Sequence, residues 1–245
     1  MEMNITKITA FIILLVTLNS CELFELDNYK SPNGGIYGKI IDSETNNPIP
    51  LPVESSTGVL IQLYEIDTKD TLEVQPINFY ANQDGTFTNT KVFNGKYNML
   101  LDGPFVVKDN YPINVNIEGQ TEINIMVTPY AHVNATADVN GKEVTISYEI
   151  VTTTDTVSFD RVYAYWNYQK LVDSYPNHFV VRERGSKQNG TFTFDLSDDE
   201  EFIKNKYKIE ANGNRVYFRI GAQVKTKVKK TRITNYSETI EIIIP

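Results

Sequence analysis

Two alternating segments on either side of one Asn-Gly pair constrain the fold of this chain more than any other feature. Residues 133–139 have the pattern Val-x-Ala-x-Ala-x-Val, and residues 144–150 have the pattern Val-x-Ile-x-Tyr-x-Ile. Alternation with a period of two places all these apolar side chains on one face of a strand. Asn140-Gly141 supplies the positive φ angles that the tightest hairpin turns require. The segment therefore predicts an antiparallel hairpin with one buried face.

Similar patterns recur along the chain and predict an all-β fold. Asp84-Gly85 is a tight-turn pair between apolar segments. Segments 113–117 and 123–127 alternate on either side of residues 118–120, Glu-Gly-Gln, which predicts another hairpin. Residues 197–200 match a helix capping box, so we expect one short helical turn there. Few other segments carry a helical period.

The charge balance argues against one class of partner. The chain has a net charge of −8 at pH 7. Nucleic-acid binding needs clustered lysines and arginines for phosphate contacts, so we expect no nucleic-acid partner. The one basic run, at residues 225–232, has the alternating lysines typical of a solvated edge strand.

The only cysteine, Cys21, follows an apolar run at residues 8–18. This arrangement resembles a bacterial lipoprotein signal peptide, in which a peptidase cuts before the cysteine and lipid is attached to its thiol. Leu18 and Ser20 match that motif, and Asn19 departs from it. The alternative is an ordinary signal peptide with a chance cysteine. A lone cysteine in an exported chain cannot form an internal disulfide, which favours lipid attachment.

The lipoprotein interpretation also gives a domain order. Residues 1–20 are the expected signal peptide, and residues 21–33, acidic and rich in turn formers, are the expected tether. Pro129 ends a strand pattern, because proline cannot donate to a sheet ladder. We therefore predict two consecutive antiparallel β-sandwich domains, at residues 34–128 and 129–245.

Five motifs in the first domain carry a family resemblance. They are Gly38-x-x-x-Asp42, Pro48, Val59-x-Ile61-x-Leu63, Asp84-Gly-Thr-Phe87 and Phe93-x-Gly95-x-Tyr97. This order is similar to the carboxypeptidase-regulatory, transthyretin-like domain, which implies a seven-stranded β-sandwich. Segments 51–58 and 102–112 are longer than in the compact form of that domain.

A second resemblance covers residues 28–128. The shared motifs are Asn28-Tyr29, Gly35-x-x-Gly38, Gly85-Thr-Phe-Thr-Asn89 and the block from Phe93 to Phe105. They are similar to a family of Bacteroidetes-type outer-membrane lipoproteins of unknown function. Genes of that family typically lie beside starch-utilisation-system-like transporters. The resemblance implies a lipid-anchored, outer-membrane protein at the cell surface, with polysaccharide and an outer-membrane transporter complex as partners.

The second domain has a resemblance of its own. Segments 216–224 and 236–242 are similar to the last two strands of fibronectin type III and immunoglobulin-like sandwiches. The chain has no Cys…Trp…Cys pattern, which excludes a disulfide-bearing immunoglobulin domain.

Sequence motifs for catalysis and cofactors are absent. His132 and His178 belong to no zinc-ligand spacing, and there is no nucleophile elbow or phosphate-binding glycine loop. Residues 195–201 place oxygen atoms at alternating positions that could hold calcium, but helix capping accounts for the same side chains. We therefore expect no cofactor, no metal and no catalysis. A carboxylate pair that meets only in the folded chain would be the route to a small hydrolase.

Residues 161–168, Arg-Val-Tyr-Ala-Tyr-Trp-Asn-Tyr, put four aromatic side chains in one predicted strand. A period of two sets Trp166 and Tyr168 on the more apolar face, so Trp166 is expected in the core. Tyr163 and Tyr165 are then expected to face outward, about 7 Å apart by strand rise. That spacing suits stacking on sugar rings.

These aromatic residues define the candidate ligand site. Tyr175 and His178 in the following loop could close its edge, so the candidates are Tyr163, Tyr165, Tyr168, Tyr175 and His178. The alternative is that the tyrosines pack against the other domain, because exposed aromatic side chains also mark interfaces. The preferred function is a carbohydrate-binding or accessory component of a glycan-uptake system. A structural spacer, adhesin or fimbria-like subunit is the alternative, followed by a small hydrolase.

Overall fold

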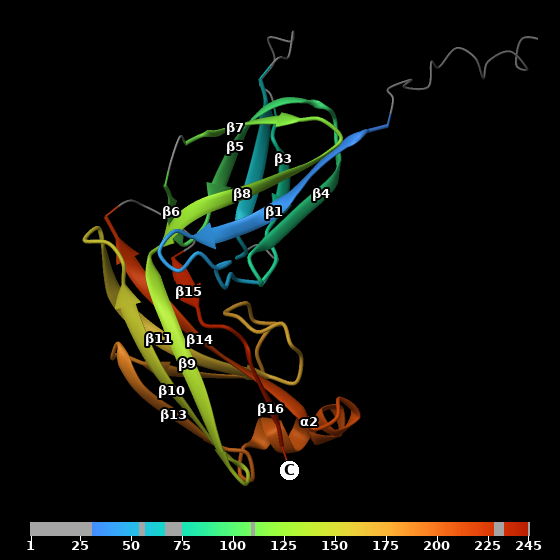
Figure 1. Cartoon of the computed structure of the whole chain (residues 1–245). Coiled ribbons are helices and arrows are strands. Elements are labelled where there is room, and N and C mark those ends of the chain that lie inside the picture. The colour runs from blue at the N-terminus through green and yellow to red at the C-terminus, as the bar shows by residue number, and fades with distance from the viewer. Residues whose placement is uncertain (1–30, 54–56, 67–74, 109–110, 228–232, 245) are drawn as a thin grey trace, which may run out of the picture.

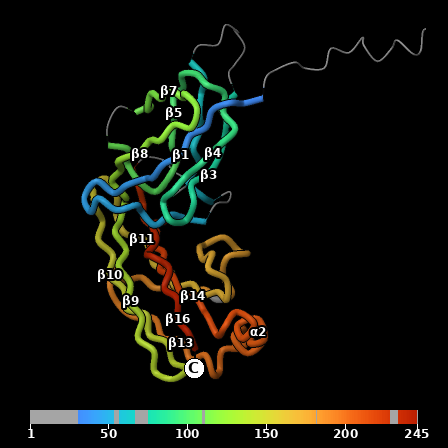
Figure 2. Tube along the Cα trace, turned by 45° about the vertical axis from the view of Figure 1, so that its right-hand side comes forward, coloured from blue at the N-terminus to red at the C-terminus, as the bar shows by residue number. Residues whose placement is uncertain are grey.

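The computed structural model describes residues 31–53, 57–66, 75–108, 111–227 and 233–244. The expected signal peptide, Cys21 and the last part of the basic run lie outside the described residues. The described chain forms two lobes, each around its own hydrophobic core (Figures 1 and 2). No helix in this part of the chain is long and apolar enough to cross a membrane.

The N-terminal lobe consists of two four-stranded sheets, in the orders β4-β1-β8-β6 and β3-β2-β5-β7. The strands are β1 (Gly34–Asp42), β2 (Leu60–Glu65), β3 (Ile77–Tyr80), β4 (Thr86–Val92), β5 (Gly95–Asp102), β6 (Phe105–Val107), β7 (Ile113–Ile117) and β8 (Gln120–Pro129). Both sheets contribute to one core, in which Ile36, Ile61 and Met99 are fully buried. The family resemblance implied seven strands, and β6, which lies in the long segment 102–112, accounts for the additional one.

The C-terminal lobe pairs a sheet of order β13-β10-β9 with one of order β12-β11-β14-β15, to which β16 is added on β14. The strands are β9 (Ala131–Asn140), β10 (Glu143–Thr152), β11 (Val157–Asn167), β12 (Val181–Gly185), β13 (Asn189–Asp195), β14 (Arg215–Thr226), β15 (Thr234–Tyr236) and β16 (Ile240–Ile243). Only Tyr130 separates β8 from β9, and these two strands run from one lobe into the other (Figure 1). The all-β prediction is confirmed.

The hairpin predicted around Asn140-Gly141 is also confirmed, although its turn residues are Gly141 and Lys142, and Asn140 is the last residue of β9. Strands β9 and β10 pair antiparallel from Asn140–Glu143 outward, and Gly141 has a φ of 61°. Along β10 the burial alternates, with Val144 and Ile146 fully enclosed. A period of two and a turn that only certain residues adopt are local properties, which is why the sequence predicts this unit correctly.

The hairpin predicted around residues 118–120 is wrong. Strand β7 pairs with β5, whereas β8 pairs with β1 in parallel, so the two strands on either side of the turn belong to different sheets. Gly119 does adopt a positive φ of 63°, and its carbonyl accepts a hydrogen bond from the backbone of Gly35 at 2.8 Å. Turn chemistry specifies a reversal of the chain but not which strands it joins, so here the turn carries the chain from one sheet to the other.

The predicted helical turn is a helix of three turns, α2 (Glu200–Ala211). Its N-cap is Asp199, whose side chain accepts a hydrogen bond from the backbone N–H of Phe202 at 2.8 Å. Phe202 and Ile209 bury one side of the helix in the core of the lobe. This tertiary packing extends the helix beyond the turn that the capping motif alone indicates.

Candidate functional site

The aromatic segment forms strand β11, and the two faces of the strand divide its side chains as predicted. Trp166 is fully buried in the core of the lobe. Tyr168, on the same side, packs partly against this core, and its hydroxyl accepts a hydrogen bond from the Lys208 ammonium of α2 at 3.2 Å. Tyr163 and Tyr165 lie on the opposite face, with their ring centroids 5.9 Å apart.

The prediction that Tyr165 faces solvent is wrong, because only 1% of the residue is exposed. The loop between β11 and β12, residues 168–180, folds back over this face of the sheet (Figures 1 and 2); we call it the covering loop. Val172 and Phe179 of this loop enclose the Tyr165 ring together with Tyr236. Burial, followed by the nearby Tyr236, raises the pKa of the Tyr165 hydroxyl well above its usual value. Tyr165 cannot stack on a ligand.

Tyr175 and His178 stabilise the covering loop through Asp173, which is fully buried. One carboxylate oxygen of Asp173 accepts hydrogen bonds from the backbone of Tyr175 at 2.9 Å and contacts the His178 ring nitrogen at 2.8 Å. The other oxygen accepts a hydrogen bond from the backbone of Val53, in the N-terminal lobe, at 2.8 Å. The rings of Tyr175 and His178 lie 5.0 Å apart, and within the described residues no ring contact links them to Tyr163. They are therefore a separate group from the Tyr163 surface.

A residue that the sequence did not single out, Arg219 of β14, is 1% exposed and joins the two lobes. Its guanidinium donates to three backbone carbonyls: to Ser237 at 2.9 Å, to Val172 at 3.0 Å and to Leu51 of the N-terminal lobe at 2.8 Å. It also lies over the Tyr236 ring, 4.6 Å from the centroid. Burial lowers the pKa of Arg219 to about 10. The only sequence signal is one arginine within the otherwise apolar segment 216–222.

A third buried polar contact between the lobes lies at Asn235. Its side-chain oxygen accepts from the backbone of Ala131 at 3.1 Å, and its amide nitrogen donates to the Pro104 carbonyl at 3.0 Å. Nearby, His132 contacts the buried Asp42 carboxylate at 2.7 Å. Among the described residues, the ring contacts of Tyr163 and Tyr165 lie within the C-terminal lobe, whereas an arginine, an aspartate and an asparagine make buried contacts with the other lobe.

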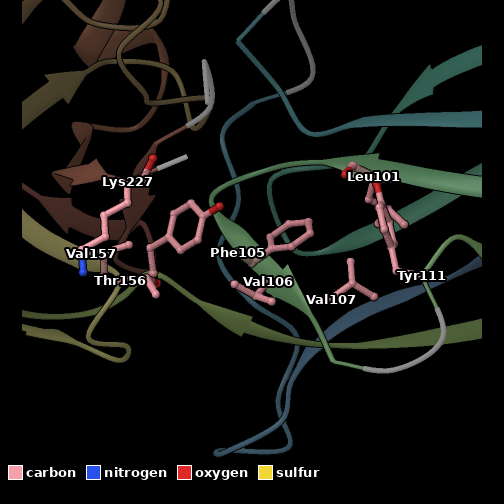
Figure 3. Close-up of a pocket in the computed structure, with 10 residues that line it drawn as sticks. Leu101, Phe105, Val106, Val107, Tyr111, Thr156, Val157 and Lys227 are labelled. Carbon is pink, nitrogen blue, oxygen red and sulfur yellow. Dashed lines mark hydrogen bonds between the residues drawn. The ribbon is translucent and has the colours of Figure 1, made fainter. Parts of the chain in front are cut away.

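A groove with a volume of about 360 Å³ lies at the junction of the lobes (Figure 3). It is lined by Leu101, Phe105, Val106, Val107, Tyr111, Tyr130, Thr156, Val157, Thr226 and Lys227. In Figure 3 the three residues of β6 lie between Tyr111 at one end and Lys227 at the other. The lining is therefore mostly apolar, with hydroxyl groups and an ammonium at the C-terminal lobe.

Tyr111 is the most exposed ring of this groove, with 49% of the residue accessible. Its hydroxyl accepts a hydrogen bond from the Leu101 backbone N–H at 3.1 Å and donates to the Leu101 carbonyl at 3.0 Å. These are the groups of β5 just beyond the point where its pairing with β7 ends. A ring anchored at its hydroxyl loses little further freedom when a ligand covers its face. The sequence identified segment 102–112 as unusually long but did not identify Tyr111.

The acidic segment before α2 caps the helix as predicted, but the N-cap is not Ser197, the first residue of the predicted capping box, whose hydroxyl instead donates to Asp195. Asp199 is the N-cap, and Asp195 accepts hydrogen bonds from the backbone and side chain of Ser197, which lower the pKa of its carboxyl. Among the described residues no group of three or more histidine, cysteine, aspartate or glutamate side chains could hold a metal ion.

Several solved structures have a fold similar to that of this chain. Crystal structures of two DUF3823 family proteins, from Parabacteroides merdae and Bacteroides uniformis, share 23% and 22% identity with this chain. Each gives a TM-score of 0.68 over 87% of this chain and 100% of its own. A third structure, from Bacteroides uniformis and named a "putative carbohydrate binding protein", gives a TM-score of 0.69 at 19% identity over 86% of this chain and 99% of its own. No curated protein matches the sequence.

The sequence itself has one family match. Residues 34–128 match the N-terminal domain of DUF3823, a family of unknown function. This interval is almost the whole of the N-terminal lobe, from the start of β1 nearly to the end of β8. The chain is thus similar to DUF3823 proteins in sequence over its first domain and in fold over most of its length.

Proposed function

We propose that this protein is a non-catalytic, lipid-anchored outer-membrane protein that acts as a carbohydrate-binding or accessory component of a glycan-uptake system. The observation that carries the proposal is the groove between the lobes, in which a half-exposed tyrosine ring is held in a fixed orientation. Binding sites for small molecules and sugars are concave, mostly apolar and supplied with a few fixed polar groups, and this groove has all three properties.

The chemistry of the groove suits a sugar. A pyranose has apolar C–H faces and hydroxyl edges. The face of Tyr111 offers an apolar surface that is already ordered, so stacking costs little conformational entropy. Thr156, Thr226 and Lys227 line the other part of the groove and carry the kinds of group that hydrogen-bond hydroxyls. The name given to the related structure from Bacteroides uniformis supports the same class of ligand.

The proposed function is tested by affinity electrophoresis of the full chain in native gels that contain neutral polysaccharides. We expect at least one polysaccharide to retard the protein. We expect Tyr111→Ala to weaken this retardation about tenfold, the equivalent of one lost aromatic contact. The matched control is Tyr207→Ala, which removes an exposed tyrosine from α2, far from the groove. Retardation that is unchanged in Tyr111→Ala would place the ligand elsewhere.

The anchor is tested separately, because Cys21 lies outside the described residues. Cys21→Ala is expected to abolish metabolic lipid labelling of the protein and to release it from the outer-membrane fraction. Lipid labelling that persists in the variant would contradict the lipoprotein proposal. A separate experiment, crosslinking of the unsubstituted protein in cells, tests whether a transporter complex is its partner at the cell surface.

A structural spacer is the second candidate, and one observation favours it. The buried contacts of Arg219, Asp173 and Asn235 tie the two lobes together with directional hydrogen bonds, as a rigid spacer requires. No retardation of the full chain by any glycan would favour this role over carbohydrate binding.

A further inference from the structure

The outer face of β11 at Tyr163, where the sequence predicts stacking on sugar rings, also carries a positive charge. Arg182 of β12 lies over the Tyr163 ring, with its guanidinium carbon 5.3 Å from the ring centroid. The same carbon lies 5.4 Å from the ring centroid of Phe179. The Tyr163 ring also has Tyr165 beside it at 5.9 Å. A ligand that approaches Tyr163 therefore meets a guanidinium rather than a free aromatic face.

The two rings hold the Arg182 guanidinium in place but leave its donors unused. Arg182 is exposed, and within the described residues no hydrogen bond or ion pair involves its side chain. Aromatic contacts lie along the faces of a guanidinium, whereas its N–H donors point outward in its plane. Arg182 is thus a cation held against two rings, and its N–H donors have no partner among the described residues.

A second arginine lies next to the first. Arg184 is two residues further along β12, about 7 Å away by strand rise, and is exposed without an ion pair among the described residues. In the register of the sheet Arg182 is opposite Tyr165 and Arg184 is opposite Tyr163, so both arginines are on the tyrosine face. Glu183 is directed to the opposite face by the strand period. The nearby Arg161 differs, because its guanidinium contacts Asp160 at 2.7 Å.

We infer that Arg182 and Arg184 form a binding site for carboxylate-bearing sugar rings, the uronates of an acidic polysaccharide. A planar guanidinium with free edges is suited to bidentate contact with a carboxylate, which is stronger and more directional than a contact with a neutral hydroxyl. Two such groups along one strand fit the charged groups of successive sugars on a chain. Because the protein as a whole has a net charge of −8, an acidic polymer would be held here and repelled over most of the remaining surface. The inference rests on the proposed carbohydrate function but concerns a surface away from the groove.

The test is affinity electrophoresis of the full chain in gels with polygalacturonate, and with its methyl ester as the uncharged counterpart. We expect polygalacturonate to retard the protein and the methyl ester to retard it at least tenfold less. We expect Arg182→Gln and Arg184→Gln each to weaken binding about tenfold, since each removes one charge-assisted contact. Arg215→Gln is the matched control: it also removes one positive charge, from an exposed arginine that already contacts Glu241 at 2.8 Å.

Several outcomes overturn the inference. Equal weakening by Arg215→Gln would show that net charge alone decides the binding. Equal retardation by dextran sulfate would remove the preference for carboxylates, and equal retardation by polyglutamate would remove the preference for sugars. Polygalacturonate binding that is lost in Tyr111→Ala but retained in the arginine variants would place the acidic ligand in the groove, and the proposed function would survive. Binding of neutral glycans without binding of polygalacturonate would likewise overturn this inference alone.

Discussion

The two faces of strand β14 are both buried, but by different partners. One face carries Val216, Phe218 and Ile220 into the apolar core that includes Trp166. The other face carries Arg219, which is covered by the loop after β11 and by the N-terminal lobe. Leu51, one acceptor of Arg219, is 168 residues away in the sequence.

This contrast separates two ways of excluding water. The core face is closed by side-chain volume, which many combinations of apolar residues can supply. The Arg219 face is closed by hydrogen bonds with fixed directions, and each buried group there depends on its partner. The first arrangement stabilises one lobe, whereas the second also fixes the position of the other lobe. Substitutions on the two faces are therefore expected to differ in how much they lower the free energy of unfolding and in whether they change the number of unfolding transitions.

The largest effect is expected on the core face. Trp166→Ala removes the largest fully buried side chain, and the enclosed site cannot collapse completely around the cavity. We expect the free energy of unfolding of the C-terminal lobe to fall by about 4 kcal/mol. Urea denaturation followed by circular dichroism measures it, because the variant lacks the only tryptophan. A loss below about 1 kcal/mol would mean that the core face is not closed by volume.

A smaller but different effect is expected on the other face. Arg219→Ala leaves the carbonyls of Leu51, Val172 and Ser237 without their donor and should cost about 3 kcal/mol. Because the arginine bridges the lobes, we expect one unfolding transition to split into two. Two transitions in Trp166→Ala and one in Arg219→Ala would reverse the assignment of roles to the two faces.

The division of the chain into two domains near Pro129 stays a prediction, and it provides the reference for these transitions. The fragments 36–128 and 130–245 are expected to unfold cooperatively, each at a lower urea concentration than its lobe in the intact chain. The reason is that separation takes the Leu51 carbonyl away from Arg219 and the Val53 N–H away from Asp173, so each buried group loses a hydrogen-bond partner. A fragment that is as stable as its lobe in the intact protein would contradict a stabilising interface.

The same contrast explains which features the sequence could predict. The core position of Trp166 and the split of the β11 tyrosines follow from a period of two, which neighbouring residues determine. The burial of Tyr165 could not be predicted in this way, because it depends on the covering loop and on the contact of Asp173 with Val53, 120 residues away. Whether a strand face is exposed depends on the whole fold, whereas the face on which a given side chain lies depends only on its position along the strand.

The candidate site divides along the same line. The strand period predicts that Tyr163 lies on the outer face, and it does, but the period does not identify its neighbour Arg182 on the adjacent strand β12. Arg182 could have been identified from the sequence only with the register of β11 and β12, which no turn motif specifies. Tyr111 lies in a segment that the sequence shows to be unusually long, but its anchored hydroxyl depends on the end of β5 that extends beyond the pairing with β7.

The pH dependence of stability offers a third comparison of the faces, because the Arg219 face includes the buried Tyr236. Burial, followed by the nearby Asp173, raises the pKa of Tyr236 from 10.0 to about 12. Between these values the unfolded chain loses a proton that the folded chain retains, so stability that is present below pH 10 is lost as the pH rises. We expect this residue to account for about 2 kcal/mol of that loss near pH 12.

The measurement is the difference in alkaline unfolding between the unsubstituted protein and Tyr236→Phe. The difference is needed because burial also raises the pKa of Tyr97, Tyr130, Tyr148 and Tyr165. The variant is expected to lose less stability between pH 10 and pH 12 than the unsubstituted protein. Parallel stability curves across that interval would show that Tyr236 titrates alike in the folded and unfolded chains.

The smallest effect on stability is expected at Tyr163, a partly exposed residue of β11 on the same face of the sheet as Arg219. Tyr163→Ala removes a partly exposed ring and its contact with Arg182, so the free energy of unfolding should fall by only about 1 kcal/mol. The same change frees the Arg182 guanidinium from one of the two rings that orient it, so binding of polygalacturonate should weaken more than stability does. Tyr163→Phe keeps the ring and should retain both. Equal binding of polygalacturonate by the alanine and phenylalanine variants would show that Arg182 binds without support from the Tyr163 ring. Ligand binding at the exposed edge of this face would then not depend on the aromatic packing beneath it.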